Sequence, residues 1–157
     1  MAIIEAKLLE LGIELPTDAI NKNALFVPSV IVNNILYTSG AVAGLGDNNH
    51  KYTGKVGSDL TLDEAKVAAR KCAINLITFI KYSVGDLDRV KRIVNIIGYV
   101  NSAPGFNRQP EVLNSVSELF LQIWGENGKH ARTALSVNEL GSDACIECNA
   151  VVEIKDK

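Results

Sequence analysis

The sequence predicts an α+β protein in which two long helices cover one face of a mixed β-sheet. The first observation is that apolar residues recur every three or four positions in segments 62–84 and 110–124, which is the period of an amphipathic helix. The second is that β-rich apolar runs come before, between and after these two segments. Helices and strands in this order favour two packed layers around one core.

The N-terminal part is expected to contain a short helix and a hairpin. Apolar residues of segment 4–11 recur with helical spacing. Two β-rich runs, 25–32 and 35–40, flank Asn33-Asn34, and asparagine tolerates the left-handed backbone that tight hairpin turns need. Segment 43–58 is rich in Gly, Asn and Asp, so we expect an exposed loop there.

Both long helices carry start and stop signals. Thr61-Leu62-Asp63-Glu64 is a capping box, in which the Thr61 side chain and the Glu64 carboxylate each accept from the other residue's amide. Gly85 is suited to end the first helix, and Pro110 is favoured in the first turn of the second, which Gly125 ends. The remaining strands are expected at 92–101, 131–138 and 144–155.

The composition is that of a globular protein with no attraction for polyanions. The chain has 157 residues, with 16 basic and 18 acidic side chains and a net charge of −2, so nucleic-acid binding is not expected. No segment is apolar over the roughly 18 residues that a membrane helix needs, and no signal peptide is recognisable. We therefore expect one domain, 1–157, in the cytoplasm. Three cysteines, an odd and sparse set, agree with that location.

The expected sheet has more apolar surface than its helices can cover. Strands 25–32 and 93–100 carry apolar side chains on both faces, whereas two helices cover only one face. An uncovered apolar face normally meets a partner, and association with copies of the same chain is the simplest solution.

Three motifs are interpreted as structural. Cys145 and Cys148 lie three residues apart in a strand, so they point to opposite faces and are expected to pack as small apolar residues. The segment 44–46 lacks the third glycine and the following helix of a dinucleotide-binding loop. His50 and His130 lie beside turns, and neither has a recognisable metal-ligand or triad neighbour, which disfavours a Ser–His–Asp hydrolase and a histidine zinc site.

Two charged residues are embedded in apolar strand sequence. Arg132 shares one strand face with the small residues Ala134 and Ser136, and Glu147 lies between Ile146 and Cys148. Charges in such surroundings are either paired or functional. Two interpretations remain open: an Arg132–Glu147 ion pair across a hairpin, or an Arg132 fork for a substrate carboxylate with Glu147 as acid and base.

The sequence resembles the RidA/YjgF family, the reactive-intermediate (enamine/imine) deaminases with the older name L-PSP endoribonucleases. The likeness covers residues 8–155, and its specific part is His130-Ala-Arg-Thr-Ala134 with Cys145-Ile-Glu147. The segments that support it are 8–16, 37–40, 104–110 with Asn114, and 125–137.

The resemblance implies a chorismate-mutase-like fold and a homotrimer with active clefts between subunits. It also implies hydrolysis of 2-imino acids, the tautomers of enamines such as 2-aminoacrylate, to 2-keto acids and ammonia, without a metal or cofactor. By position, Arg132 binds the substrate carboxylate and Glu147 positions water. The implied substrate-binding residues are Phe26, Ser39, Gly40, Asn114 and Ala134.

The chain departs from the family's pattern at several of these positions. Phe26 replaces a pocket Tyr and lacks its hydroxyl, Ala134 replaces a frequent Cys, and Ala41 and Gly141 replace a Gln and a Pro. Two other functions are therefore considered. A non-catalytic trimer that binds small carboxylates agrees with Phe26, whereas retention of Arg132 and Glu147 argues for catalysis. A ribonuclease is disfavoured by the acidic balance and the lack of a histidine pair.

Overall fold

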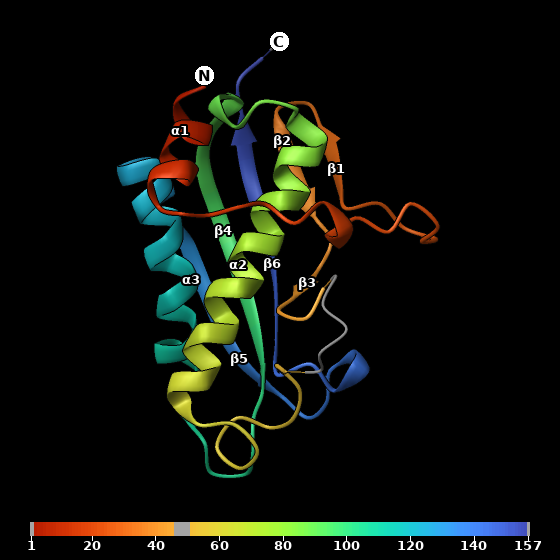
Figure 1. The fold of residues 1–157 in the computed structure, drawn as a ribbon, viewed down its shortest axis with the longest axis vertical. Coiled ribbons are helices and arrows are strands. Elements are labelled where there is room, and N and C mark those ends of the chain that lie inside the picture. Colours follow the sequence, from red (N-terminus) through yellow and green to blue (C-terminus); the bar gives the residue numbers. More distant parts are fainter. Residues whose placement is uncertain (1, 46–50, 157) are drawn as a thin grey trace.

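A computed structural model describes residues 2–45 and 51–156 (Figure 1). Its helices are α1 (Ile3–Glu10), α2 (Leu62–Val84) and α3 (Gln109–Trp124). Its strands are β1 (Ser29–Val32), β2 (Ile35–Thr38), β3 (Ala41–Val42), β4 (Val90–Asn101), β5 (Ala131–Val137) and β6 (Ile146–Ile154). The predicted α+β class is confirmed.

One mixed sheet contains the named strands, in the order β1-β2-β6-β4-β5, with β3 paired to β6. Strand β5 runs parallel to β4, because α3 carries the chain back along the helix layer before β5 begins. Strand β6 then pairs antiparallel with β4 on its other side. The expected hairpin between the last two strands is therefore wrong: β4 lies between them.

Helices α2 and α3 pack side by side on one face of the sheet (Figure 1). Alternate residues of β6 are buried against them, which gives the period of two that a one-sided core produces. Close packing is visible at Gly98 of β4, where an added Cβ would lie 2.1 Å from Leu113 Cδ1 of α3. No helix in the described part of the chain is long and apolar enough to cross a membrane.

The other face of the sheet exposes apolar side chains, as the sequence predicts. Val30 and Tyr37 are cross-strand partners and are 52% and 50% exposed. Leu135 of β5 is 43% exposed on the same face. This face, away from α2 and α3, is called the open face below.

The predicted capping signals are present. Thr61 and Glu64 form both hydrogen bonds of the capping box at the start of α2, and Gly85 ends that helix with a φ of 76°. Asn33 has a φ of 56° in the β1–β2 turn, as predicted.

Two local predictions near the N-terminus need correction. The first strand starts at Ser29, so the preceding residues, including Phe26, are outside it. The expected loop 43–58 is not exposed throughout, because Ala43 and Val56 are buried. The short strand β3 lies just before this segment, where residues 41 and 42 find partners on β6. His50 and part of the 44–46 motif lie outside the described residues.

Candidate functional site

The strand register places Arg132 and Glu147 on opposite faces of the sheet. Arg132 is level with Ile96 of β4, and Glu147 is level with Tyr99. Residues three apart on one strand point to opposite faces, and Ile96 is buried under the helices. No ion pair among residues 2–45 and 51–156 joins Arg132 to Glu147. The Arg132–Glu147 ion-pair interpretation is therefore wrong.

Arg132 points to the helix-covered face, where α3 holds it. Its Nη1 donates to Asn114 Oδ1 at 2.9 Å and to Ser117 Oγ at 3.1 Å. Asn114 and Ser117 are three residues apart and so lie on one face of α3. Ala134, two residues after Arg132, lies on the same face of β5. The structure thus brings together three of the predicted site residues: Arg132, Asn114 and Ala134.

A histidine that sequence reasoning set aside completes this cluster. His130 Nε2 lies 3.0 Å from Ser117 Oγ, and His130 Nδ1 lies 2.7 Å from the Gly128 carbonyl oxygen. Burial, and to a lesser extent the charge of Arg132, lowers the pKa of His130 below its ordinary value. The sequence indicates no metal-ligand or triad neighbour for His130, and it did not reveal these hydrogen bonds. One signal in the sequence could have indicated that His130 lies near Arg132. The two residues are two positions apart at the start of a strand, and such residues point to the same face of the sheet.

A cavity of about 320 Å³ lies beside this cluster. It is lined by Ser117, Leu121, Lys129, His130 and Arg132. Lys129 is also paired with Glu126 at 2.8 Å. The cavity therefore combines cationic side chains with a hydroxyl and an imidazole, which suits a small anion.

Glu147 faces the open side of the sheet. Within the described residues, neither an ion pair nor a hydrogen bond of this carboxylate is found, and burial raises its pKa. An added Cβ at Gly40 would lie 1.9 Å from Glu147 Oε1, so only glycine allows the backbone to approach the carboxylate this closely. A half-buried, unpaired carboxylate with a raised pKa is typical of functional acids and bases.

Ser39 and Phe26 lie near the start of the sheet. Ser39 Oγ donates to the Val27 carbonyl at 2.6 Å, and its amide donates to the Pro28 carbonyl at 2.8 Å. Ser39 therefore holds the segment that carries Phe26, which is 67% exposed. Residues 20–28 project from the body of the molecule, to the right in Figure 1. This segment is called the arm below.

Within one chain, the predicted site is split into two groups. Arg132, Asn114 and Ala134 lie on the helix-covered face at β5, an edge strand of the sheet. Glu147 and Gly40 lie together on the open side, next to Ser39 in sequence. The sheet separates the two groups, so one chain alone does not bring Arg132 and Glu147 to one reacting group.

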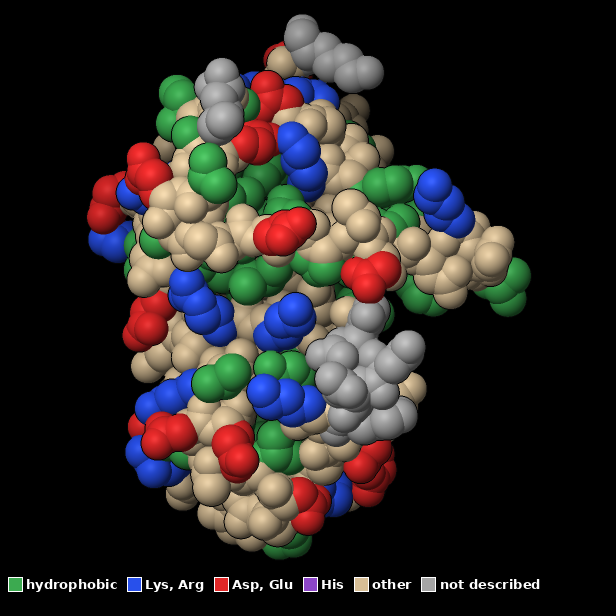
Figure 2. All heavy atoms as spheres, in the orientation of Figure 1, with side chains coloured by type: hydrophobic (Ala, Val, Ile, Leu, Met, Phe, Trp, Pro, Cys, Tyr) green, Lys and Arg blue, Asp and Glu red, His purple; other side chains and the backbone are tan. Residues whose placement is uncertain are grey.

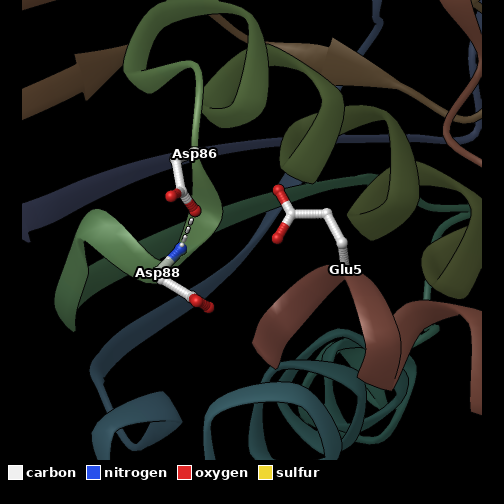
Figure 3. Close-up of side chains that lie close together, drawn as sticks. All are labelled: Glu5, Asp86 and Asp88. Atoms are coloured by element: carbon white, nitrogen blue, oxygen red, sulfur yellow. Dashed lines mark hydrogen bonds between the residues drawn. The ribbon is translucent and has the colours of Figure 1, made fainter. Parts of the chain in front are cut away.

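A second group of carboxylates, at Glu5, Asp86 and Asp88, has a structural explanation (Figure 3). The two Asp88 oxygens accept from the amides of Ile3 and Ile4, each at 2.8 Å, and so cap α1. Glu5 pairs with Lys81. Asp86 Oδ1 accepts from the Asp88 amide at 2.9 Å. Asp88 and Glu5 thus fix the N-terminal helix to the end of α2 and the turn that follows it.

The cysteines are buried and reduced. Cys72 Sγ donates to the Ala41 carbonyl, with 2.9 Å between the heavy atoms, and burial raises the pKa of Cys145 to about 11. A thiol with a raised pKa is a poor nucleophile and metal ligand, so Cys145 acts as a small packing residue. Cys148 is fully buried in the core and packs in the same way, as predicted.

Comparison with known proteins places this geometry in a family. A family model described as "YjgF/chorismate mutase-like, putative endoribonuclease" matches residues 5–148. Protein TCP17 of Trypanosoma cruzi is 38% identical over 154 residues, which cover 98% of this chain and 95% of TCP17. The chain therefore belongs to the YjgF/chorismate mutase-like family, which confirms the resemblance seen in the sequence.

Two solved structures are similar over nearly the whole chain. The Agrobacterium tumefaciens protein Atu1372, described as of unknown function, is 37% identical, with a TM-score of 0.88 over 98% of this chain and 93% of its own. A "putative endoribonuclease" from Shewanella oneidensis is 30% identical, with a TM-score of 0.89 over 96% of this chain and 99% of its own. These two proteins thus have nearly the same fold as this chain, but their descriptions do not agree on an activity.

Proposed function

We propose that this protein hydrolyses 2-imino acids, and their enamine tautomers such as 2-aminoacrylate, to 2-keto acids and ammonia. The observation that carries the proposal is that, among the described residues, neither Arg132 nor Glu147 has an ion-pair partner. A guanidinium without a carboxylate partner is available to an anionic substrate. An ionisable carboxylate without a cation is available to accept a proton.

We further propose that three copies assemble and that the active cleft forms between neighbouring copies. The split of the two residue groups supports this, because only a second copy can bring a Glu147 to an Arg132. The exposed apolar residues of the open face supply surface for such an assembly. The arm supplies more, since Leu25 and Val27 are 105% and 54% exposed on either side of Phe26.

In the proposed chemistry, Arg132 binds the substrate and Glu147 moves protons. Arg132 holds the substrate carboxylate and so fixes the adjacent C=N carbon. Glu147 accepts a proton from water as the water oxygen adds to that carbon, and passes this proton to the imine nitrogen, which gives a carbinolamine. Glu147 then takes the proton of the new hydroxyl and gives it to the amino nitrogen as the C=O bond forms and the C–N bond breaks. One imine and one water thus give one 2-keto acid and one ammonia, and no electrons are gained or lost.

An assay of 2-keto acid release tests this function. An amino-acid oxidase generates the imino acid, and its conversion is followed with and without the protein. We expect Arg132→Ala to lower turnover by about thirty- to thousandfold, the cost of losing a charge-assisted, bidentate contact. Arg92→Ala is a matched control, because Arg92 is exposed on β4. Equal rates for wild-type protein and buffer would reject the proposal.

A non-catalytic trimer that binds small carboxylates is the second candidate, since Phe26 lacks the hydroxyl of the family's Tyr. It predicts that the wild-type protein binds a 2-keto acid by calorimetry but releases none from the imino acid. A ribonuclease is less well supported. On the face shown in Figure 2, which α2 and α3 cover, basic and acidic side chains are interspersed and no single basic patch forms.

A further inference from the structure

We infer that Ser117 and a neutral His130 are positioning residues for Arg132, and that protonation of His130 weakens binding of the substrate carboxylate. The inference rests on the proposed function, because it assigns Arg132 the carboxylate. It adds a role for Ser117, which lies outside the motif segments, a role for His130 within the motif around Arg132, and a pH dependence of affinity.

The hydrogen bonds of Arg132 define which edge of its guanidinium remains for a ligand. Nη1 carries two protons, and it donates to two oxygens, Asn114 Oδ1 and Ser117 Oγ. Within the described residues, Nε and Nη2 make no hydrogen bond. Nε–H and one Nη2–H form a parallel fork that matches a carboxylate, as Arg108 shows with Glu111 in this same chain. α3 therefore fixes one nitrogen and leaves this fork for the substrate.

The Gly128 carbonyl, at the end of the network, determines the direction of each hydrogen bond in it. The Gly128 carbonyl can only accept, so His130 Nδ1 carries the proton. In the neutral ring, Nε2 is then an acceptor and takes the Ser117 hydroxyl proton. The Ser117 oxygen in turn accepts from Arg132 Nη1. The chain of donors runs from Arg132 through Ser117 to His130, and every member is satisfied.

Protonation of His130 reverses the direction of the hydrogen bond between Ser117 and His130. Nε2 becomes a donor and competes with Arg132 Nη1 for the Ser117 oxygen, and a second positive charge then lies next to the guanidinium. The surroundings favour the neutral ring. Phe120 packs edge-on with 6.1 Å between ring centroids, Arg132 and Lys129 are cationic, and Glu126 is engaged by Lys129. Burial and Arg132 accordingly lower the pKa of His130.

Variants of the two residues separate positioning from a merely structural role. Ser117→Ala removes the link, and we expect the Kd for 2-oxobutanoate and the KM for the imino acid to rise by about tenfold, with kcat little changed. Ser115→Ala, on the same helix, is the matched control. His130→Gln keeps an acceptor near the Nε2 position but does not titrate.

The expected pH profiles differ among these variants. Wild-type affinity should fall as the pH drops through the lowered pKa of His130, below its ordinary value near 6.5. His130→Gln should lose this acid limb, and Ser117→Ala should weaken it, because that variant removes the competition for the Ser117 oxygen but not the charge of a protonated His130. Unchanged affinity in Ser117→Ala, or an acid limb that persists in His130→Gln, would overturn the inference.

A measurement without substrate keeps the inference distinct from the proposed function. Nitrogen NMR of wild-type protein should show the Nδ1–H tautomer of His130, and exchange of the Arg132 Nη protons should quicken in Ser117→Ala but not in Ser115→Ala. If these signals appear and no 2-keto acid binds, the proposed function fails and the positioning network stands. The Nε2–H tautomer at neutral pH would refute the network itself.

Discussion

At the scale of single residues, the carboxylate of Glu147 decides between the functions considered. A carboxylate that serves only to neutralise an arginine must lie against it, and strand register puts Glu147 on the other face of the sheet from Arg132. Burial without a cation raises the pKa of Glu147, so the ionised form costs folding free energy at neutral pH. Such a cost is typical of residues retained for function rather than stability.

Glu147→Gln should therefore lower turnover without lowering stability. Loss of a general base lowers turnover by about 10²–10⁴-fold. Because the folded-state pKa is raised, the stabilising effect of Glu147 exists below its unfolded value of 4.5 and is lost as the pH rises through the folded value. At neutral pH the glutamine variant should melt no lower than wild type, by scanning calorimetry. A melting temperature several degrees lower would indicate a structural partner for Glu147.

Gly40→Ala tests the same carboxylate through its neighbour. The new Cβ would lie 1.9 Å from Glu147 Oε1, so the carboxylate must move. We expect a large loss of turnover with little change in the circular dichroism spectrum. Gly44→Ala is the matched control, because an added Cβ there meets no atom within 4 Å. Equal turnover in both variants would show that the position of the Glu147 carboxylate is unimportant.

At the scale of elements, the sequence predicts best what neighbouring residues determine. The capping box at Thr61, the Gly85 helix end and the Asn33 turn are all local, and all are confirmed. The parallel pairing of β5 with β4 was missed, because a crossover through α3 leaves no mark in either strand. The cap of α1 was missed for a similar reason: Asp88 lies 85 residues from Ile3.

Asp88→Asn should loosen α1 while the sheet stays intact. Hydrogen bonds from the Ile3 and Ile4 amides lower the pKa of Asp88, so its contribution is present above the unfolded value of 3.8 and is lost as the pH falls through the folded value. At neutral pH we expect a loss of about 1 kcal/mol, typical of a helix N-cap. Hydrogen exchange should quicken in α1, with Asp18→Asn as a control outside this cap. Unchanged exchange in α1 would contradict this role.

In the candidate site, too, the sequence identifies residues that belong to a motif but not the contacts that depend on the tertiary structure. Family likeness identified Arg132, Asn114 and Glu147 by position, and α3 does bring Asn114 to Arg132. Ser117 lies outside the matched motifs, and its contact with His130 depends on how α3 lies over the start of β5. Which face each charge takes depends on β4 separating β5 from β6, which only the complete topology provides.

At the scale of the whole molecule, the proposed cleft requires two copies of the chain. Arg132 lies near one edge of the sheet on the helix side, and Glu147 lies on the open side. The open face and the arm expose apolar residues that an assembly would cover, among them Val30, Leu135 and Phe26. Light scattering should therefore find trimers, and Leu135→Asp should favour monomers with little turnover. A stable, fully active monomer would refute the shared cleft.

Mixing two inactive variants tests the shared cleft directly. Arg132→Ala and Glu147→Gln subunits each keep the group that the other lacks. In randomly mixed rings of three, a cleft is intact when its Arg132 comes from one variant and its Glu147 from the other, which occurs in about one quarter of clefts at equal amounts. Refolding the two variants together should restore about that fraction of wild-type turnover.

The control for this mixture replaces the Glu147→Gln subunit by a chain with both substitutions. Every cleft then lacks Arg132 or Glu147, so turnover should stay at the level of the single variants. A second mixture, of wild type with the doubly substituted chain, sets the scale, because about one quarter of its clefts are also intact. If both groups instead came from the same chain, that second mixture would retain about half of the wild-type turnover, and the two single variants together would restore none.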